Sequence, residues 1–137
     1  MKKRVFVILL GVFLLLTSAC SKFTYSFTQK GNNIKIEVNN AEDGKEAESN
    51  YFSVGKNKVV TLESSLEKGQ LQIDFTSVTV FTHTDEDDEV IYGDVVESVV
   101  LGPGDTAELK LEKGDYILQI ISIGNTNGTV TMNINKE

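Results

Sequence analysis

Apolar and polar residues alternate with a period of two over most of the chain after residue 22. Such alternation puts apolar side chains on one face of an extended strand, so it predicts half-buried β-strands. The clearest case is segment 70–75, in which Leu71, Ile73 and Phe75 alternate with polar residues. At Thr76–Ser77 the alternation changes parity, which predicts a bulge or a bend of the sheet.

The same pattern predicts a hairpin at the start of the domain and a series of short strands after it, at 23–28, 34–38, 51–54, 59–62, 90–92, 95–101, 107–111, 116–123 and 130–134. Polar, Gly-containing segments between them predict a loop at 39–50, a connection at 64–69, and turns at 93–94, 102–105 and 124–128. Asn127-Gly128 in the last of these favours a type I′ hairpin turn. Segment 116–123 is apolar on both faces in its middle, as expected of a central strand covered on both sides.

Regularly spaced short strands predict an all-β fold. We expect an antiparallel β-sandwich, of the jelly-roll or immunoglobulin-like kind, with about eight strands. A β-barrel is the alternative. The sandwich would occupy residues 23–137 as one domain.

The first nineteen residues have a different pattern. Lys2, Lys3 and Arg4 precede an apolar run over 5–16 that only Gly11 interrupts, and small residues follow at 17–19. This is the layout of a secretory signal peptide. At roughly 1.5 Å per residue the apolar run is too short a helix to cross a hydrocarbon layer about 30 Å thick. We therefore expect 1–19 to be a leader helix that is removed on export.

The only cysteine, Cys20, directly follows that leader. The segment Leu16-Thr17-Ser18-Ala19-Cys20 resembles the lipobox of bacterial lipoproteins, although Thr17 stands where the family usually has a large aliphatic residue. The segments IKIEVNNAEDG and VGKNKVVTLESSLEKGQLQIDF and the closing Gly-Asp-Tyr are similar to small lipoproteins of the Firmicutes type. The alternative is that Cys20 is an ordinary residue of a secreted protein.

The resemblance implies that Cys20 is joined to diacylglycerol and becomes the new N-terminus. Residues 20–22 would then be a lipid-anchored segment on the extracytoplasmic face of the cell membrane. Two acyl chains hold a protein at a membrane far better than one, so the anchoring would be stable. The partner that this resemblance implies is the membrane, reached through the lipid on Cys20.

Charge narrows the range of other partners. Thirteen basic residues less the three of the leader leave ten against twenty acids, so the processed chain carries a net charge of about −10. Phosphate binding needs clustered Lys and Arg, which excludes nucleic acid as an expected partner. A single cysteine cannot form an intramolecular disulfide, so the domain must be stable on its core alone.

The densest group of potential metal ligands is the acidic run Asp85-Glu86-Asp87-Asp88-Glu89. Calcium takes six to eight such oxygens, and Asp85, Asp87, Asp88 and Glu89 are the candidate ligands. The run lacks the spacing of an EF-hand, and a solvated loop kept extended by charge repulsion is the alternative. A second acidic segment, with Glu42, Asp43, Glu46 and Glu48, would complete a site only if the fold brings the two together.

His83 stands beside this run, but no motif places a nucleophile or an orienting carboxylate near it. We therefore expect no enzymatic activity, no catalytic residue and, apart from possible calcium, no cofactor. The predicted function is that of a lipid-anchored surface module that binds a protein, a peptide or an envelope polymer. The alternative is a calcium-binding or glycan-binding accessory domain that uses the acidic loops.

Overall fold

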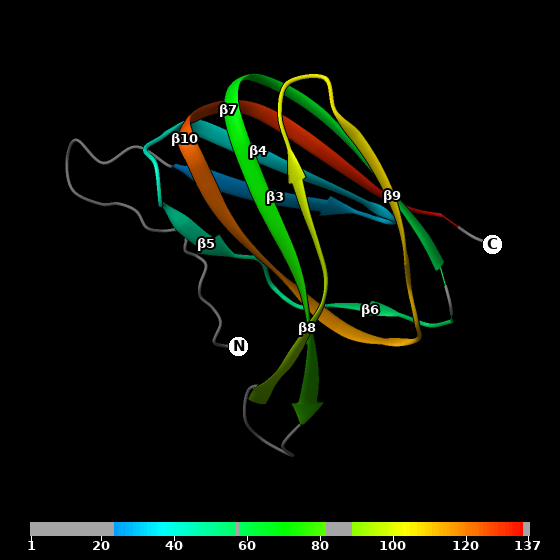
Figure 1. The fold of residues 1–137 in the computed structure, drawn as a ribbon. Coiled ribbons are helices and arrows are strands. Elements are labelled where there is room, and N and C mark those ends of the chain that lie inside the picture. The colour runs from blue at the N-terminus through cyan, green and yellow to red at the C-terminus, as the bar shows by residue number, and fades with distance from the viewer. Residues whose placement is uncertain (1–23, 57, 82–88, 136–137) are drawn as a thin grey trace.

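A computed structural model describes residues 24–56, 58–81 and 89–135 (Figure 1). They form eight antiparallel strands: β3 (Tyr25–Lys30), β4 (Asn33–Ala41), β5 (Glu46–Glu48), β6 (Phe52–Val54), β7 (Lys58–Phe81), β8 (Glu89–Leu101), β9 (Thr106–Leu111) and β10 (Gly114–Asn135). The predicted all-β fold with about eight antiparallel strands is confirmed. In these three ranges there is no helix long and apolar enough to cross a membrane. The predicted leader helix at 1–19 lies outside them.

Two long strands, β7 and β10, organise the fold. They pair with each other along almost their whole length, from Asp115 opposite Val78 to Asn135 opposite Val59. Both strands bend in the middle, so each contributes one half to each of two layers (Figure 1). The sandwich is therefore one continuous hydrogen-bonded sheet folded over on itself.

The front sheet, nearer the viewer in Figure 1, contains residues 114–123 of β10 and 70–81 of β7. Strands β5 and β6 flank it on the β10 side, and β8 flanks it on the β7 side. The back sheet contains residues 126–135 of β10 and 59–68 of β7, flanked by β4 and β3 on one side and by β9 on the other.

Two glycines allow the paired strands to bend together. Gly69 of β7 and Gly128 of β10 have φ angles of 80° and 134°, values that favour glycine. A Cβ atom at Gly128 would lie 2.5 Å from the Cα of Leu66, and one at Gly69 would meet the backbone of Asn125 and Thr126. The bend thus depends on backbone contacts that a side chain would block.

This bend makes two sequence predictions wrong. Segment 64–69 is not a connection, and 124–128 is not a hairpin with a type I′ turn, because each lies inside a continuous strand. The register of the β7–β10 pair shifts between Ile123 and Asn127 and again before Gly128. The glycines that resemble turn residues in the sequence therefore accommodate an irregularity in the ladder.

The core lies between the two sheets and consists of the inward residues of the alternating pattern. Leu71, Ile73 and Phe75 are fully buried, as their spacing predicted. Their partners in the core cluster come mainly from both halves of β7 and β10 and from β4: Ile34, Ile36, Val38, Val60, Leu62, Leu118, Ile120, Val130, Met132 and Ile134. Since all of these side chains are apolar, burial of their surface is the main stabilising contribution.

The sequence predicts a bulge or bend at Thr76–Ser77, and the ladder is irregular at this position, but the extra residues lie in the neighbouring strand β8, while β7 stays in regular register with β10. The register of β7 against β8 shifts on both sides of Thr76, and Val95 then faces Thr76 while Tyr92 faces Val78. The predicted turn at 93–94 is wrong, because these two residues lie inside β8, where together they face the single residue Ser77. A Cβ at Gly93 would lie 2.6 Å from the Ser77 hydroxyl oxygen, so glycine fits the close approach there.

The remaining elements follow the predicted pattern with one exception. The hairpin β3–β4, the turn at 102–105 and strands β6 and β9 form as expected. In the predicted loop 39–50, however, β4 continues to Ala41, and Glu46–Glu48 form β5 against residues 119–121 of β10. Strand β5 carries one apolar residue, Ala47, between two acids, so it has little of the apolar pattern that predicts a strand.

Candidate functional site

Most of the residues predicted to carry chemistry lie outside the described ranges. These are Cys20, His83, Asp85, Asp87 and Asp88. Glu89, the fourth candidate calcium ligand, is the exposed first residue of β8 and stands opposite Phe81. The lipid-anchor and calcium hypotheses therefore stay predictions.

The second acidic segment is spread over the molecule. The Asp43 carboxylate accepts a hydrogen bond from the Gly124 amide at 2.7 Å, beside the bend of β10. Glu48 instead lies on the outer face of the front sheet, next to Gln119. Within the described part of the chain, no three His, Cys, Asp or Glu side chains gather closely enough to hold a metal ion.

A polar row crosses the outer face of the front sheet. Glu48 of β5, Gln119 of β10, Asp74 of β7 and Ser98 of β8 occupy successive strands in register. Ser98 donates a hydrogen bond to Asp74 at 2.6 Å, and the Gln119 side-chain amide donates to Glu48 at 2.9 Å. The two carboxylates thus accept hydrogen bonds from neutral donors within this row.

Tyr92 of β8 joins the same row, because its hydroxyl donates to Glu48 at 2.6 Å. Burial raises the pKa of Tyr92, and the hydrogen bond and the negative charge of Glu48 raise it further. Beneath Tyr92 and its neighbours, Thr76, Ile117 and Val78 are buried although they lie outside the main core. The base of β8 is therefore fixed to the front sheet by a small second cluster.

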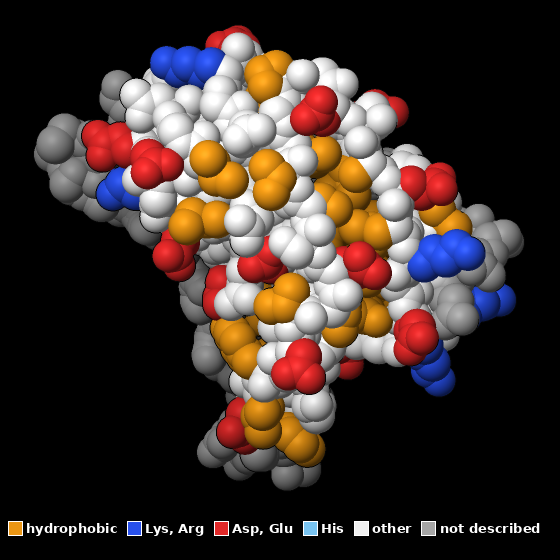
Figure 2. All heavy atoms as spheres, in the orientation of Figure 1, with side chains coloured by type: hydrophobic (Ala, Val, Ile, Leu, Met, Phe, Trp, Pro, Cys, Tyr) orange, Lys and Arg blue, Asp and Glu red, His pale blue; other side chains and the backbone are white. Residues whose placement is uncertain are grey.

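Exposed apolar side chains concentrate in one place. Among the described residues, six of the seven large hydrophobic residues that are exposed lie at the end of β7 and along β8: Phe81, Ile91, Tyr92, Val95, Val96 and Val100. Each of the six is between 47 and 51 per cent exposed. We call these six residues the apolar arm. Strands β7 and β8 project below the two sheets in Figure 1, and apolar side chains mark this projection in Figure 2.

Strand β8 is also an edge of the front sheet. Its only ladder partner among the described strands is β7, along one side. Its thirteen residues include Asp94 and Glu97 but no Lys, Arg or Pro. Figure 2 shows acidic side chains between the apolar ones on this face, while the basic ones lie toward the rim. The apolar arm and the free side of β8 together form the candidate binding site.

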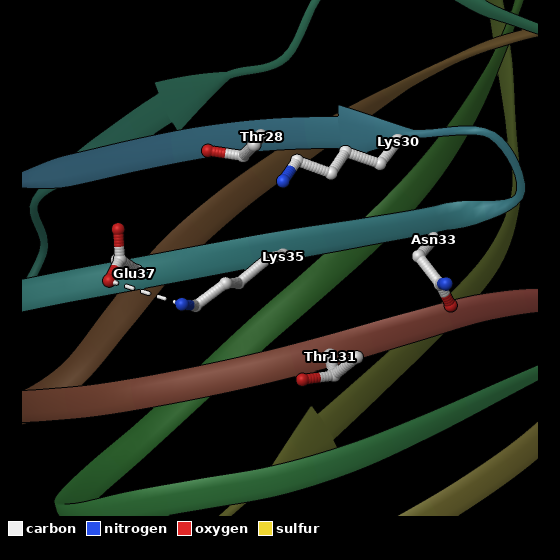
Figure 3. Close-up of a pocket in the computed structure, with 6 residues that line it drawn as sticks. All are labelled: Thr28, Lys30, Asn33, Lys35, Glu37 and Thr131. Carbon is white, nitrogen blue, oxygen red and sulfur yellow. Dashed lines mark ion pairs between the residues drawn. The ribbon is translucent and has the colours of Figure 1, made fainter.

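A shallow depression of about 420 Å³ lies on the outer face of the back sheet (Figure 3). Its lining comes from β3, β4 and β10: Thr28, Lys30, Asn33, Lys35, Glu37 and Thr131. Lys35 and Glu37 form an ion pair at 3.6 Å, and both side chains are about half exposed. Because Glu37 offsets one of the two lysine charges, the depression offers only a weak attraction for an anion.

Sequence reasoning did not identify either surface. The outward position of Lys35, Glu37 and Thr131 follows from strand alternation, but their meeting depends on the register between β4 and β10. The apolar arm is missed for a different reason. Val95, Val96 and Val100 have the apolar character of core residues, and only the absence of a covering layer leaves them exposed.

Comparison with known proteins places the chain in no family, since neither a family model nor a curated protein matches it. Solved structures match at low similarity. A chain from Bacillus endospore appendages, described as a family of disulfide-linked pili, is 16% identical, with 88% of this chain and 96% of that chain covered and a TM-score of 0.47.

Two further solved structures are less similar. One from work on the structure and function of CBM4 is 6% identical, with 80% of this chain and 73% of that chain covered and a TM-score of 0.40. The cupin domain of Drosophila melanogaster CENP-C is 11% identical, with 81% of this chain and 75% of that chain covered and a TM-score of 0.34.

Proposed function

We propose that this protein is a lipid-anchored, non-enzymatic binding module on the extracytoplasmic face of the cell membrane, and that the apolar arm is where it binds another protein. The observation that carries the proposal is the concentration of six exposed large hydrophobic residues at the end of β7 and along β8. Exposed apolar residues concentrated in one region are typical of interaction sites. Elsewhere in the described residues, Ile123 is the one large hydrophobic residue that is exposed.

The position of the anchor supports the same function. Tyr25, the first residue of β3, is only five positions after Cys20, so a lipid on Cys20 would hold the domain close to the membrane. A short tether of this kind keeps a binding surface at high local concentration near membrane partners. The arm belongs to β7 and β8, whereas the first described strand after the tether is β3.

Membrane attachment is tested by Cys20→Ala followed by cell fractionation. The native chain is expected in the membrane fraction, and the variant is expected in the medium or as an unprocessed precursor. Cys20 is the only cysteine, so the substitution removes no disulfide. A variant that fractionates with the membrane in processed form would overturn the lipid anchor.

Binding by the arm is tested by photo-crosslinking in intact cells. A photoreactive amino acid is placed at Val96 in the arm or, as the control, at Thr131 on the exposed back sheet. We expect a discrete adduct from position 96 only, with the partner identified by mass spectrometry and the adduct lost in Val100→Lys. Equal adducts from both positions would contradict binding by the arm.

The second candidate function is calcium or glycan binding, and the polar row favours it. Glu48, Gln119, Asp74 and Ser98 present carboxylate, amide and hydroxyl groups side by side, which suits sugar hydroxyls. A calcium ion would instead take its ligands from the acidic run at 85–89, which lies mostly outside the described residues. Thermal melting with increasing calcium tests the ion, because a ligand that binds only the native state raises the melting temperature. An unchanged melting temperature at millimolar calcium would exclude the ion site.

A further inference from the structure

We infer that β8 binds its partner by strand addition, and that the partner supplies an extended segment in which Lys or Arg alternates with aliphatic residues. This inference rests on the proposed function and specifies its mode. It combines the free side of β8, the valine side chains along it and the charge around it.

The backbone of β8 provides the first argument. A strand that pairs on one side only leaves a row of N–H and C=O groups on its other side. Soluble proteins usually protect a long edge with charged residues, proline, bulges or a covering segment. Strand β8 is thirteen residues long and has neither Lys nor Pro; its ladder is irregular opposite Thr76 but regular from Glu97 to Leu101, and this regular segment is where we place the added strand. An extended peptide could satisfy these backbone groups and continue the front sheet.

The side chains of β8 provide the second argument. Val100 and Ser98 lie on the outer face of the front sheet, since they stand opposite Gln72 and Asp74. Val99 points toward the core, where it is half-buried. An added strand would place its own alternate side chains beside Val96 and Val100, both about half exposed. Contacts of this kind give strand addition its sequence preference.

Charge selects the partner. Asp94 and Glu97 of β8 and Asp74 beside it carry negative charge, and β8 has no basic residue. A second copy of this chain would bring acids opposite acids, and like charges on opposed strands are destabilising. A segment with Lys or Arg at alternate positions would instead place opposite charges across the new ladder. The acidic edge therefore disfavours self-association and favours a basic partner.

The test uses the full chain, purified from membranes in neutral detergent, and a fluorescent octapeptide of alternating lysine and valine. Fluorescence anisotropy gives the dissociation constant. We expect saturable binding, and an octapeptide with glutamate in place of lysine to bind at least about tenfold more weakly. No binding of the lysine peptide at millimolar concentration would overturn the inference.

Two N-methylated peptides separate strand addition from simple charge attraction. One is methylated at every valine amide and the other at every lysine amide, so each loses the hydrogen-bond donors along one of its two edges. We expect at least one of them to bind about tenfold or more weakly than the parent peptide, with charge and side chains unchanged. Equal affinity of all three peptides would overturn strand addition while leaving the arm as a binding surface.

Variants of the protein locate the binding. Val100→Lys adds a positive charge on β8, and Ile123→Lys adds one at the remaining exposed hydrophobic residue, on β10. We expect a loss of about tenfold in affinity for the lysine peptide from Val100→Lys and less than twofold from Ile123→Lys. Equal losses would overturn the assignment to β8.

Sedimentation of the same samples tests whether β8 pairs with a second copy of this chain instead. We expect the chain to remain monomeric within its micelle, because the acidic edges repel each other. A dimer that Val100→Lys disrupts would show that β8 pairs with a second copy and would overturn the basic-partner inference. The proposed function is tested separately by the crosslinking experiment. It would be overturned if position 96 gave no adduct, or the same adducts as position 131.

Discussion

The bent β7–β10 pair and the apolar arm contain similar residues but are buried to very different extents. In the pair, the alternating apolar residues of β7 from Val60 to Phe75 face a second layer and are buried. Beyond Val78, β7 loses β10 as a partner, because β10 begins at Gly114 with Asp115 opposite Val78. From there only β8 accompanies it, and Phe81 and Ile91 are about half exposed. Apolar alternation thus forms strands in both regions, but a covering sheet decides which residues become core.

The largest expected effect is at the bend of the β7–β10 pair. Gly128→Ala should reduce the free energy of unfolding by about 4 kcal/mol, because φ is unfavourable for alanine and the new Cβ would meet the backbone of β7. Urea denaturation measures the change. Gly124→Ala is the control, since its φ is 72° but nothing lies within 4 Å of the added atom. It should cost only about 1 to 2 kcal/mol. Equal costs would show that the close approach at Gly128 relaxes easily.

Truncation of one side chain in each region tests the comparison directly. Leu118→Ala should reduce the free energy of unfolding by about 3 kcal/mol, because Leu118 is completely buried in the core and its removal leaves a cavity. Val96→Ala in the arm should change it by less than about 0.5 kcal/mol. Urea denaturation of both variants gives the two values. A loss of 2 kcal/mol or more from Val96→Ala would mean that the arm is covered in solution.

The sequence predicts those features of the β7–β10 pair and of the arm that depend on residues close together in the chain. Leu71, Ile73 and Phe75 are predicted correctly because strand alternation is a local property. The change of parity at Thr76–Ser77 correctly marks the position of an irregular ladder, but the extra residues lie in β8, which the pattern along β7 alone does not show.

The segments that failed depend on contacts between strands distant in sequence. Gly69 and Gly128 indicate turns locally, but each faces the backbone of the other long strand at the bend. Strand β5 forms because β10 offers a free edge beside Ala47. The exposure of Phe81 and Ile91 depends on where β10 begins, which no local pattern shows. The acidic candidates at 85–88 and the anchor at Cys20 stay predictions.

A smaller effect is expected from a single buried hydroxyl at the bend. Thr126 is completely buried, and its hydroxyl donates a hydrogen bond to the Gln70 carbonyl at 3.0 Å. Thr126→Val keeps the shape but leaves that carbonyl without this donor, so the free energy of unfolding should fall by about 1 to 2 kcal/mol. Thr131→Val on the exposed back sheet should change it by less than about 0.5 kcal/mol. Urea denaturation compares the two, and equal changes would show that water replaces the Thr126 hydrogen bond.

The smallest effect concerns the hydrogen bond from Tyr92 to Glu48, which connects the arm to β5 of the front sheet. Burial raises the pKa of Tyr92, and its contact with Glu48 raises it further, so the folded state holds this proton more tightly than the unfolded state. The resulting stabilisation is complete below the ordinary tyrosine pKa of about 10, and it is lost as pH rises through the higher folded-state pKa. Phenolate absorbance, compared between the native chain and Tyr92→Phe, isolates this group.

Glu48→Gln should shift that titration to lower pH without restoring the ordinary value, because the negative charge disappears while the burial remains. Tyr25→Phe is the control, because its hydroxyl donates to the Lys45 carbonyl instead. It should leave the Tyr92 titration unchanged. If Tyr92 ionised near pH 10 in the native chain, the contact with Glu48 would not persist in solution. The arm would then be free to move from its base, and the edge of β8 would not be preorganised for an added strand.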